Sequence, residues 1–516
     1  MATPLEQLIQ HSQQPWLEVL GSLGQPDDLV QQAQERYHYL QVLQAELGDR
    51  PLRVVITESD PITFLSSFVA ACSWPTVVCL GNPGWGQQEW QIVQTWIQPD
   101  WVWGLDQPLI GTTAPSEQPE LTAGQILIPT GGSSGQLRFA IHTWQTLAAS
   151  VAGLHASRLL ASTEPIHSVC VLPLYHVSGL MQFMRSLLTG GQLRVMPWRG
   201  LTASGPPFSQ PTTDREFSDK PLTNWCLSLV PTQLQRLLET ASTKPQLLKW
   251  LQQFAIIFLG GAPAWPALLQ MARAAQLNLA PTYGMTETAS QIVTLAPQDF
   301  LAIPGDRPRQ LLEQSAAYCG HPLPHATLQI VDQHGKLCPA QVTGMIQIRA
   351  RSLCQGYYPP LDPAIQAQRW PAPDVFCPDD LGYLDVTGGL HVVGRRSRTI
   401  ISGGEKIFPG EVELVIRATG LVRDVAVLGL PDPSWGEVVV ALYIPNLPIE
   451  DLQQTLNIQA LQTKLRQQLS AYKCPKYWLA CEALPRNVQG KLNYAQLRQI
   501  ARDRVAQRVE ANLRAE

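Results

Sequence analysis

The feature that most limits the fold of this chain is an alternation of helix-like and strand-like segments in its N-terminal part. Apolar residues recur at helical spacing over 29–47, and short β-rich runs follow at 52–57 and 76–80. Successive parallel strands need a crossover connection, usually a helix, so this order predicts crossover units and a mainly parallel sheet. The rhythm returns in three later runs, each followed by Pro or Gly: 168–172, 224–230 and 254–259.

The pattern of apolar and polar residues changes at Cys319. Residues 326–331 and 344–349 alternate apolar and polar side chains. Such alternation is typical of antiparallel strands with one buried face. We therefore expect an antiparallel, barrel-like part over 319–394.

A second change falls near 394–398. Beyond it, helix-like stretches at 410–419 and 458–469 accompany a strand-like run at 425–428. About 120 residues is an ordinary size for a separate domain. The sequence therefore predicts a small α+β domain at the C-terminal end.

Composition excludes several classes of protein. Hydrophobic residues are 45 % of the 516 residues, enough for a sizeable core and too many for a disordered chain. The formal net charge is −4 with no long basic run, so we expect no nucleic-acid partner. The 10 cysteines contain no C-x-x-C pair, which argues against a zinc ribbon or a redox motif.

Two observations concern location. No apolar run approaches the ~20 residues that a membrane-spanning helix needs. The first residues lack a basic stretch followed by an apolar one, which is the pattern of a secretory signal. We therefore expect a cytoplasmic protein with no integral membrane segment.

The densest cluster of small residues follows a β-rich run at 126–128. Its members are Thr130, Gly131, Gly132, Ser133, Ser134 and Gly135. Small residues let backbone N–H groups converge on a phosphate, and hydroxyl groups add donors, so the cluster predicts an anion-binding loop. It is not a Walker A loop, because no Gly-Lys-Ser/Thr follows. An ordinary Gly/Ser turn is the alternative.

The same cluster matches G-x-S-x-G, the nucleophile elbow of α/β-hydrolases, with Ser133 as the nucleophile. That elbow needs a strand, a sharp turn and then a helix. Residues 137–142 instead have the pattern of another strand. A hydrolase that uses Ser133 is therefore the second hypothesis.

A second segment, at 280–289, combines an aromatic ring, a glycine, a hydroxyl group and a carboxylate. Tyr283 could stack on a planar base and Thr286 could donate to a phosphate. Glu287 could hold Mg²⁺, which prefers oxygen ligands. A polar loop with a chance acid is the alternative.

Three further segments place charged residues beside glycines or a hairpin. An acid within 379–385 precedes a hairpin and can bind both hydroxyl groups of a ribose. A glycine turn at 403–404 leads into an acid-led helix, and a Gly-Lys pair lies within 484–492. Each of these patterns is weak by itself.

Taken together and in this order, the five segments resemble the adenylate-forming enzymes: acyl- and aryl-CoA synthetases, luciferases and the adenylation domains of peptide synthetases. The resemblance implies an α/β fold with a large N-terminal domain, 1–394, of two helix-flanked sheets plus a β-barrel. It implies a small, mobile C-terminal α+β domain, 395–516, on a hinge at 396–398. It also implies ATP, Mg²⁺ and CoA as cofactor and co-substrates.

The resemblance further implies roles for individual residues. It assigns catalysis to Lys491, Thr286 and Glu287, with Glu287 as the Mg²⁺ ligand, and it assigns the CoA path to Gly403 and Gly404. The phosphate loop, the adenine pocket, the ribose acid and its basic neighbour would form the ATP site: Thr130, Gly131, Gly132, Ser133, Ser134, Gly135, Gly260, Gly261, Ala262, Tyr283, Gly284, Met285, Asp380 and Arg395.

Three places depart from the family pattern. Leu137-Arg138-Phe139 stands where Pro-Lys-Gly is usual, and Arg138 offers a planar fork rather than a point charge. Pro378-Asp379 replaces the Thr-Gly before the ribose aspartate, and Arg398 replaces an acid at the end of the hinge. Each departure concerns loop geometry, and none removes a group that the chemistry needs.

Within the family, segments 173–180, 228–237 and 284–293 resemble the 2-succinylbenzoate–CoA ligases of menaquinone and phylloquinone synthesis. This branch implies an aromatic acid with two carboxylates, held by four residues: His176, Thr232, Ser290 and Gln291. A satisfied structural histidine is the alternative for His176. Other aryl- or acyl-CoA ligases stay open for the substrate, and a homodimer stays open for the assembly.

Overall fold

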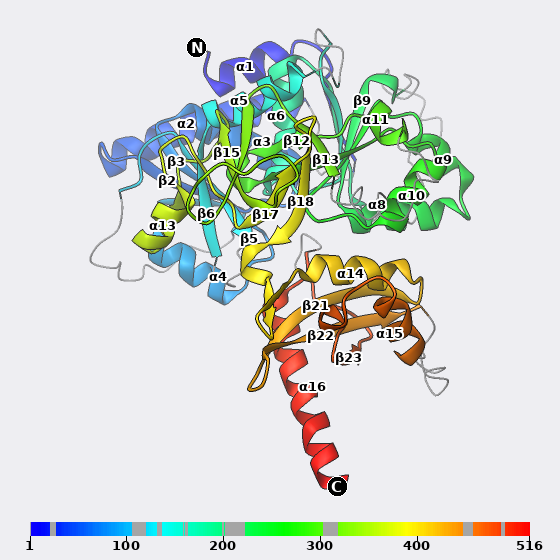
Figure 1. Cartoon of the computed structure of the whole chain (residues 1–516). Coiled ribbons are helices and arrows are strands. Elements are labelled where there is room, and N and C mark those ends of the chain that lie inside the picture. The colour runs from blue at the N-terminus through cyan, green and yellow to red at the C-terminus, as the bar shows by residue number, and fades with distance from the viewer. Residues whose placement is uncertain are drawn as a thin grey trace.

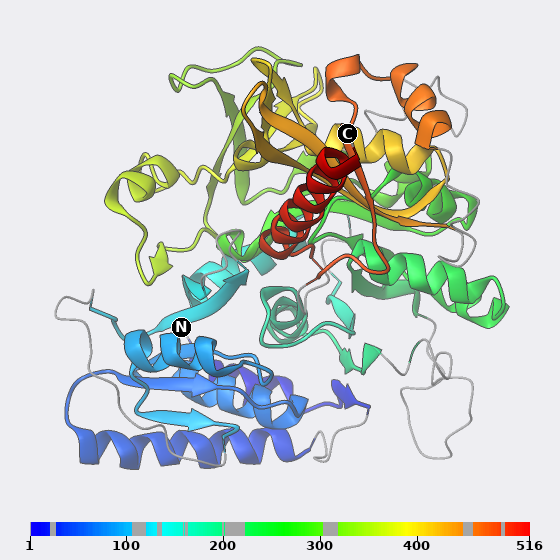
Figure 2. The same ribbon diagram turned by 90° about the horizontal axis from the view of Figure 1, so that it is seen from below.

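The computed structural model describes residues 2–20, 27–105, 120–131, 137–157, 159, 164–198, 201, 222–302, 318–446, 458–486 and 491–515. They form a large part (2–395) built on two sheets and a small unit (400–515) built on a third (Figure 1). Seen from below, the N-terminal helices and strands (blue) lie at the lower edge, while the C-terminal helix of the small unit (red) crosses the middle of the view (Figure 2). No helix among these residues has the length and apolar character needed to cross a membrane.

The first sheet has six strands in the order β16-β6-β5-β3-β2-β4. Its parallel strands are β2 (Leu52–Ile56), β3 (Thr76–Leu80), β4 (Trp101–Trp103) and β5 (Gln125–Gly131). β6 (Leu137–Thr143) and β16 (Tyr357–Tyr358) extend it antiparallel. The helix expected over 29–47 and the parallel strands expected after it are confirmed, the helix as α2 (Asp28–Leu47).

The second sheet has twelve strands in the order β1-β8-β7-β9-β10-β11-β12-β13-β18-β17-β15-β14. The first six are parallel: β1 (Leu17–Val19), β8 (Leu193–Val195), β7 (His167–Cys170), β9 (Trp225–Leu229), β10 (Ile256–Leu259) and β11 (Leu279–Met285). The rest are antiparallel: β12 (Ser290–Thr294), β13 (Tyr318–Pro322), β18 (Leu390–Arg395), β17 (Asp380–Leu384), β15 (Gly344–Ala350) and β14 (Ala326–Val331). The antiparallel strands expected over 319–394 thus continue the second sheet.

The two sheets share one apolar core. Helices α3 (Pro61–Ser73), α5 (Trp144–His155) and α6 (Val177–Thr189) contribute buried side chains to it, together with strands of both sheets. A second core includes α8 (Pro231–Ala241), α9 (Pro245–Leu251), α10 (Pro266–Ala274) and α11 (Pro297–Ala302) with the second sheet. Among the described residues, the other α-helices of the large part are α1 (Pro4–His11), α4 (Gln87–Ile92) and α13 (Pro363–Arg369), with a π-helical turn at Val93–Ile97.

Many of these helices begin with proline. The first turn of a helix leaves its N–H groups without helical partners, so a residue that lacks this donor fits there with little loss. Proline also fixes φ near the helical value. At α3 the preceding Asp60 accepts hydrogen bonds from the backbone N–H groups of Ile62 and Thr63, at 3.0 and 3.1 Å, which fixes where the helix starts.

The small unit contains a five-stranded sheet, in which β20-β19-β22-β21 is joined by β23 on β22. Its strands are β19 (Ile400–Ser402), β20 (Glu405–Ile407), β21 (Val422–Asp432), β22 (Gly436–Pro445) and β23 (Tyr477–Ala480). α14 (Pro409–Ala418) and α15 (Ile458–Arg466) share one core with the sheet, and α16 (Tyr494–Ala515) shares another. α14 also packs against β18 and α10 of the large part.

The expected fold class, α/β with a small C-terminal α+β unit, is confirmed. The boundary between residues 394 and 395 stays a prediction. The strand expected at 425–428 is longer, because β21 pairs with β22 along most of a long antiparallel hairpin. Most of the loop expected at 201–222 lies outside the described residues.

Candidate active site

The centre of the site is the turn that joins β11 to β12, at the edge where the parallel strands of the second sheet end. Ligands bind at this edge in open α/β sheets. A short 3₁₀ turn, Thr286–Thr288, follows the last residues of β11. At Gly284 an added Cβ would lie 2.2 Å from the carbonyl oxygen of Ser290, so the close approach of the two strands requires glycine.

Tyr283, Asp380 and Arg395 meet on one side of this turn. The Tyr283 hydroxyl donates to Asp380 Oδ2 at 2.9 Å, and Arg395 Nε lies 3.3 Å from Asp380 Oδ1. Asp380 and Arg395 are directly opposite each other on β17 and β18. Burial and the Asp380 carboxylate raise the pKa of Tyr283 well above its usual value. Each carboxylate oxygen keeps a second lone pair, so Asp380 can still accept from a pair of hydroxyl groups.

Glu287 lies on the turn itself. The Tyr357 hydroxyl donates to its carboxylate, and Cys354 N–H donates to its main-chain carbonyl oxygen at 2.8 Å. Burial and the Glu287 carboxylate raise the pKa of Tyr357. The described residues contain no cluster of three or more His, Cys, Asp or Glu that could hold a metal ion. A single carboxylate fits Mg²⁺ that is carried mainly by phosphate oxygens and water.

The predicted phosphate loop starts beside the same turn. Thr130 and Gly131 end β5, and the loop residues Gly132, Ser133, Ser134 and Gly135 lie outside the described residues. β6 follows and pairs antiparallel with β5. A strand therefore comes after the loop, and the strand–turn–helix order of a hydrolase elbow is not met here.

The loop predicted to flank the adenine follows β10, next to β11. Gly260, Gly261 and Ala262 lie in this loop, and the last two are exposed. An added Cβ at Gly260 would lie 2.4 Å from Thr282 Oγ1, and Gly261 has a φ of +79°. The backbone here can therefore approach a planar ligand closely.

Lys491 brings the small unit to this site. Its side chain is exposed to solvent on the described surface. Surrounding protein atoms and the positive charge of Arg395 lower its pKa, and Glu287 and Asp380 act in the opposite direction. Its charge also contributes, after burial, to lowering the pKa of His176 to about 4. Lys491 is thus close enough to all four of these side chains to interact electrostatically with them.

The glycine turn predicted for the CoA path has a different environment. Gly403 and Gly404 join β19 to β20 with φ values of +60° and +87°, which favour glycine. The N–H of Gly403 donates to the Trp435 carbonyl oxygen at 2.8 Å, and the Trp435 ring covers Gly403. Trp435 belongs to the small unit, so this turn is held within that unit.

A buried arginine lies on the other side of the β11–β12 turn. Arg185 projects from α6 and is only 4 % exposed. Its Nη2 donates to Ser290 Oγ at 3.0 Å and to Gln291 Oε1 at 2.7 Å. Its guanidinium also lies over the ring of Phe258, at 5.3 Å, and burial lowers its pKa to about 10. Among the described residues no carboxylate forms an ion pair with it.

The other residues that the sequence predicts to contact the acid substrate differ in their burial and hydrogen bonding. His176 is the residue just before the first turn of α6 and is buried, and burial lowers its pKa to about 4, so the ring is neutral at pH 7. Gln291 Nε2 is buried without a hydrogen-bond partner. Thr232 lies at the start of α8 and is half-buried. No described hydrogen bond joins Thr232 to Arg185, Ser290 or Gln291.

Comparison with known proteins identifies the family. The model of the AMP-binding enzymes matches residues 42–358, and the model of their C-terminal domain matches residues 411–491. The chain belongs to the AMP-binding enzyme family. The resemblance noted in the sequence is therefore confirmed.

Two relatives of this AMP-binding enzyme are 2-succinylbenzoate–CoA ligases. The protein from Enterococcus faecalis is 30 % identical over 377 residues, covering 73 % of this chain and 70 % of the relative. That from Listeria monocytogenes serovar 1/2a is 31 % identical over 395 residues, covering 74 % and 71 %. The o-succinylbenzoate-CoA synthetase of Bacillus subtilis, solved with its acyl-adenylate intermediate, has a TM-score of 0.73 at 22 % identity over 95 % of this chain and 97 % of its own.

Arg185 is the residue of this AMP-binding enzyme that the sequence analysis missed. It is the one charged residue in α6, a helix whose residues are otherwise mostly apolar and buried. Such a residue is almost never fully buried unless it is paired. A lone arginine in an apolar helical segment was the available signal, but its partners follow more than 100 residues later.

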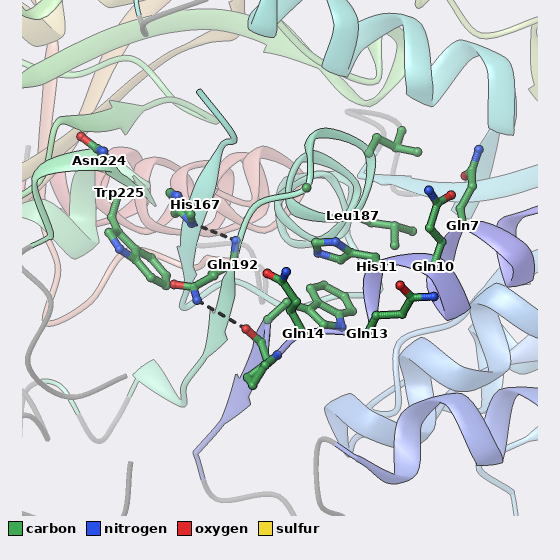
Figure 3. Close-up of a pocket in the computed structure, with 14 residues that line it drawn as sticks. Gln7, Gln10, His11, Gln13, Gln14, His167, Leu187, Gln192, Asn224 and Trp225 are labelled. Carbon is green, nitrogen blue, oxygen red and sulfur yellow. Dashed lines mark hydrogen bonds between the residues drawn. The ribbon is translucent and has the colours of Figure 1, made fainter. Parts of the chain in front are cut away.

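A cavity elsewhere in the AMP-binding enzyme contains none of the predicted site residues. It has a volume of about 650 Å³ and lies at the amino ends of β7, β8 and β9, away from the edge that carries the site (Figure 3). Its lining is rich in amide and aromatic side chains, among them Gln7, His11, Trp16, His167, Gln192 and Trp225. The candidate active site is therefore defined by the clustered residues and not by this cavity.

Proposed function

We propose that this AMP-binding enzyme is an AMP-forming 2-succinylbenzoate–CoA ligase of menaquinone or phylloquinone synthesis. A carboxylate oxygen of the acid bonds to the α-phosphorus of ATP, and pyrophosphate leaves. The thiol sulfur of CoA then bonds to the acyl carbon, AMP leaves and the thiol proton is released. The curated relatives support this assignment.

The observation that carries the choice of acid is the buried cluster of Arg185, Ser290 and Gln291. A buried guanidinium without an anionic partner is costly, and a carboxylate that fills the place beside it removes that cost. 2-Succinylbenzoate has two carboxylates, of which one reacts and the other must be held. The second carboxylate would pair with Arg185 and accept from Gln291 Nε2, a donor without a partner, and from the Ser290 hydroxyl once it turns away from Gln291 Oε1.

The nucleotide would occupy the opposite side of the β11–β12 turn. Tyr283, Gly284 and Met285 would contact the adenine together with the loop after β10, and Asp380 would accept from the ribose hydroxyl groups, with Arg395 beside it. Thr286 would donate to the phosphates. Mg²⁺, bound with ATP at Glu287, would neutralise phosphate charge.

Lys491 would act in the first step. Attack of a carboxylate on a phosphate brings two anions together, so the transition state needs positive charge at their junction. The electrostatic proximity of Lys491 to Glu287, Asp380 and Arg395 supports this role. The Gly403–Gly404 turn would line the CoA path only after the small unit rotates about 396–398.

The test is a panel of carboxylic acids offered with ATP and Mg²⁺, with and without CoA. We expect AMP and pyrophosphate with 2-succinylbenzoate, and a thioester only when CoA is present. Consumption of ATP with none of the acids, combined with ester cleavage that is lost in Ser133→Ala, would favour a hydrolase and overturn the assignment. We also propose that the enzyme works in the cytoplasm, with no nucleic-acid partner, and that a homodimer is compatible with this function.

A further inference from the structure

Arg398 is the last residue of the predicted hinge, 396–398. It ends a 3₁₀ turn, Arg396–Arg398, that connects β18 of the large part to β19 of the small unit. Its guanidinium carbon lies 3.7 Å from the centre of the Tyr494 ring. Such a short distance over an aromatic face is a strong cation–π arrangement. Tyr494 begins α16, three residues after Lys491.

A buried carboxylate explains why a cation suits this position. Glu413 on α14 accepts from the Val427 N–H at 2.8 Å and lies 3.7 Å from Arg417 Nη1. Burial raises the pKa of Glu413, whereas Arg417 and Arg398 lower it. Burial raises the pKa of Tyr494, and the charge of Glu413 raises it further. An acid at position 398 would face this carboxylate and would be repelled, while arginine is attracted to both neighbours.

The segment that carries Lys491 is anchored on both sides. Before it, Arg486 Nη2 lies 2.5 Å from Asp424 Oδ2 on β21. The N–H of Asn493, which follows Lys491, donates back to the Pro485 carbonyl oxygen at 2.9 Å. After it, Tyr494 meets Arg398. The second anchor is the one that connects the Lys491 segment to the hinge.

The hinge is in turn tied to the nucleotide side of the site. Asp379 accepts from the N–H of Ser397 at 2.9 Å through Oδ2 and from the N–H of Arg396 at 2.7 Å through its carbonyl oxygen. Asp379 immediately precedes Asp380. A set of contacts therefore runs from Asp379 through the hinge to Arg398 and Tyr494, and Tyr494 follows Lys491 by three residues in the chain.

We propose that Arg398 is a positioning residue for adenylation, and that its stack on Tyr494 sets the place of Lys491 relative to the hinge. The inference rests on the proposed function. Arg398 acts through Tyr494 and not on the substrate. Because Lys491 would serve only the first half-reaction, loss of the stack affects acyl-adenylate formation and leaves transfer to CoA unchanged.

The test compares both half-reactions in matched variants of the full-length enzyme. Arg398→Met keeps the length of the side chain and removes its charge, Tyr494→Leu removes the ring, and Tyr494→Phe keeps the ring. Pyrophosphate release from ATP and 2-succinylbenzoate reports the first half-reaction. Thioester formation from added acyl-adenylate and CoA reports the second.

We expect Arg398→Met and Tyr494→Leu to slow pyrophosphate release by about three- to thirty-fold, the range of a cation–π contact, and to leave thioester formation within about two-fold. In Tyr494→Phe the rates of pyrophosphate release and thioester formation should both stay within about two-fold of those of wild type. The double variant should be no slower than the slower single variant, because both changes remove one contact. Arg273→Met removes a comparable stack on Phe300, at 4.4 Å and away from the hinge, and should change neither half-reaction.

Equal losses in both half-reactions, or no loss in either, would overturn the inference. Thermal unfolding of each variant identifies a folding defect. Such a defect lowers the rates of both half-reactions together, and this result counts against the positioning role. A wild-type enzyme that consumes no ATP with any acid would refute the proposed function and this inference together. A wild-type ligase whose variants lose both half-reactions equally would refute the inference alone.

Discussion

His142 on β6 donates from Nε2 to the main-chain carbonyl oxygen of Thr286 at 2.7 Å. This bond joins the strand that follows the predicted phosphate loop to the turn that carries Thr286 and Glu287. Thr146 Oγ1 lies 2.9 Å from the other ring nitrogen, so both ends of the imidazole are held. The bond fixes the relative position of two loops that would both contact the phosphates of ATP.

His142→Leu should therefore destabilise the protein and weaken ATP binding. The carbonyl oxygen of Thr286 would keep the Ala289 N–H, at 3.0 Å, and lose the hydrogen bond from His142, which costs about 0.5–1.5 kcal/mol. Urea unfolding measures this loss, and the KM for ATP should rise at the same time. His142→Gln retains a hydrogen-bond donor, so its stability should lie between those of His142→Leu and wild type. Equal stability of the Leu variant and wild type would contradict the role.

Stability should fall as the pH is lowered below about 6.5, the ordinary pKa of histidine. Burial lowers the pKa of His142 to about 4, and burial followed by the charge of Lys491 does the same for His176. Between these pH values the unfolded chain binds protons that the folded protein does not, so the free energy of unfolding decreases with decreasing pH. Above about pH 6.5, the free energy of unfolding should not depend on the titration of His142 and His176.

Each such histidine contributes a slope of up to about 1.4 kcal/mol per pH unit. His142→Gln removes one titrating group and should reduce the measured slope by about that amount between pH 6 and 4.5. Urea unfolding at several pH values provides the measurement. An unchanged slope in the variant would show that His142 titrates normally in the folded protein.

Lys491→Ala should abolish most adenylation. Removal of one preorganised group that stabilises developing charge typically costs about 10²–10³ in rate. Thioester formation from added acyl-adenylate should be spared, because the charge is needed only while pyrophosphate leaves. Equal loss in both half-reactions would make Lys491 a structural residue.

Ser397→Pro should affect the two half-reactions unequally. Proline fixes φ and removes the N–H that Asp379 accepts at 2.9 Å, so one orientation of the small unit is disfavoured relative to the other. Rapid-quench measurement of each half-reaction checks this. A variant fully active in both would argue against rotation at this position.

The sequence predicted those parts of the site that lie on contiguous motifs. Tyr283 and Glu287 share one segment, and Asp380 and Arg395 belong to one hairpin, so the family motifs on these segments were enough to select them. That the Tyr283 hydroxyl donates to Asp380 could not be predicted, because this contact depends on how β11 and β17 are placed within one sheet.

The acid side was predicted only in part. Ser290 and Gln291 were selected from a motif, whereas the charge that they contact comes from Arg185 on a different element. A side chain in a helical segment acquires this kind of partner only when the helix is packed between the sheets. The same reason explains Arg398, which was noted as a departure but whose partners, Tyr494 and Glu413, are set by packing of the small unit.

The proposed function depends on Arg185, through which the enzyme would select an acid with a second carboxylate. The most direct measurement compares kcat/KM for 2-succinylbenzoate with kcat/KM for benzoate, a cinnamate and octanoate, in wild type and in Arg185→Met. We expect a preference of about 10² or more for 2-succinylbenzoate in wild type, because the other acids leave buried polar groups unpaired, and a loss of most of that preference in the variant. Preference of the wild type for benzoate, the cinnamate or octanoate, or an unchanged preference in Arg185→Met, would contradict it.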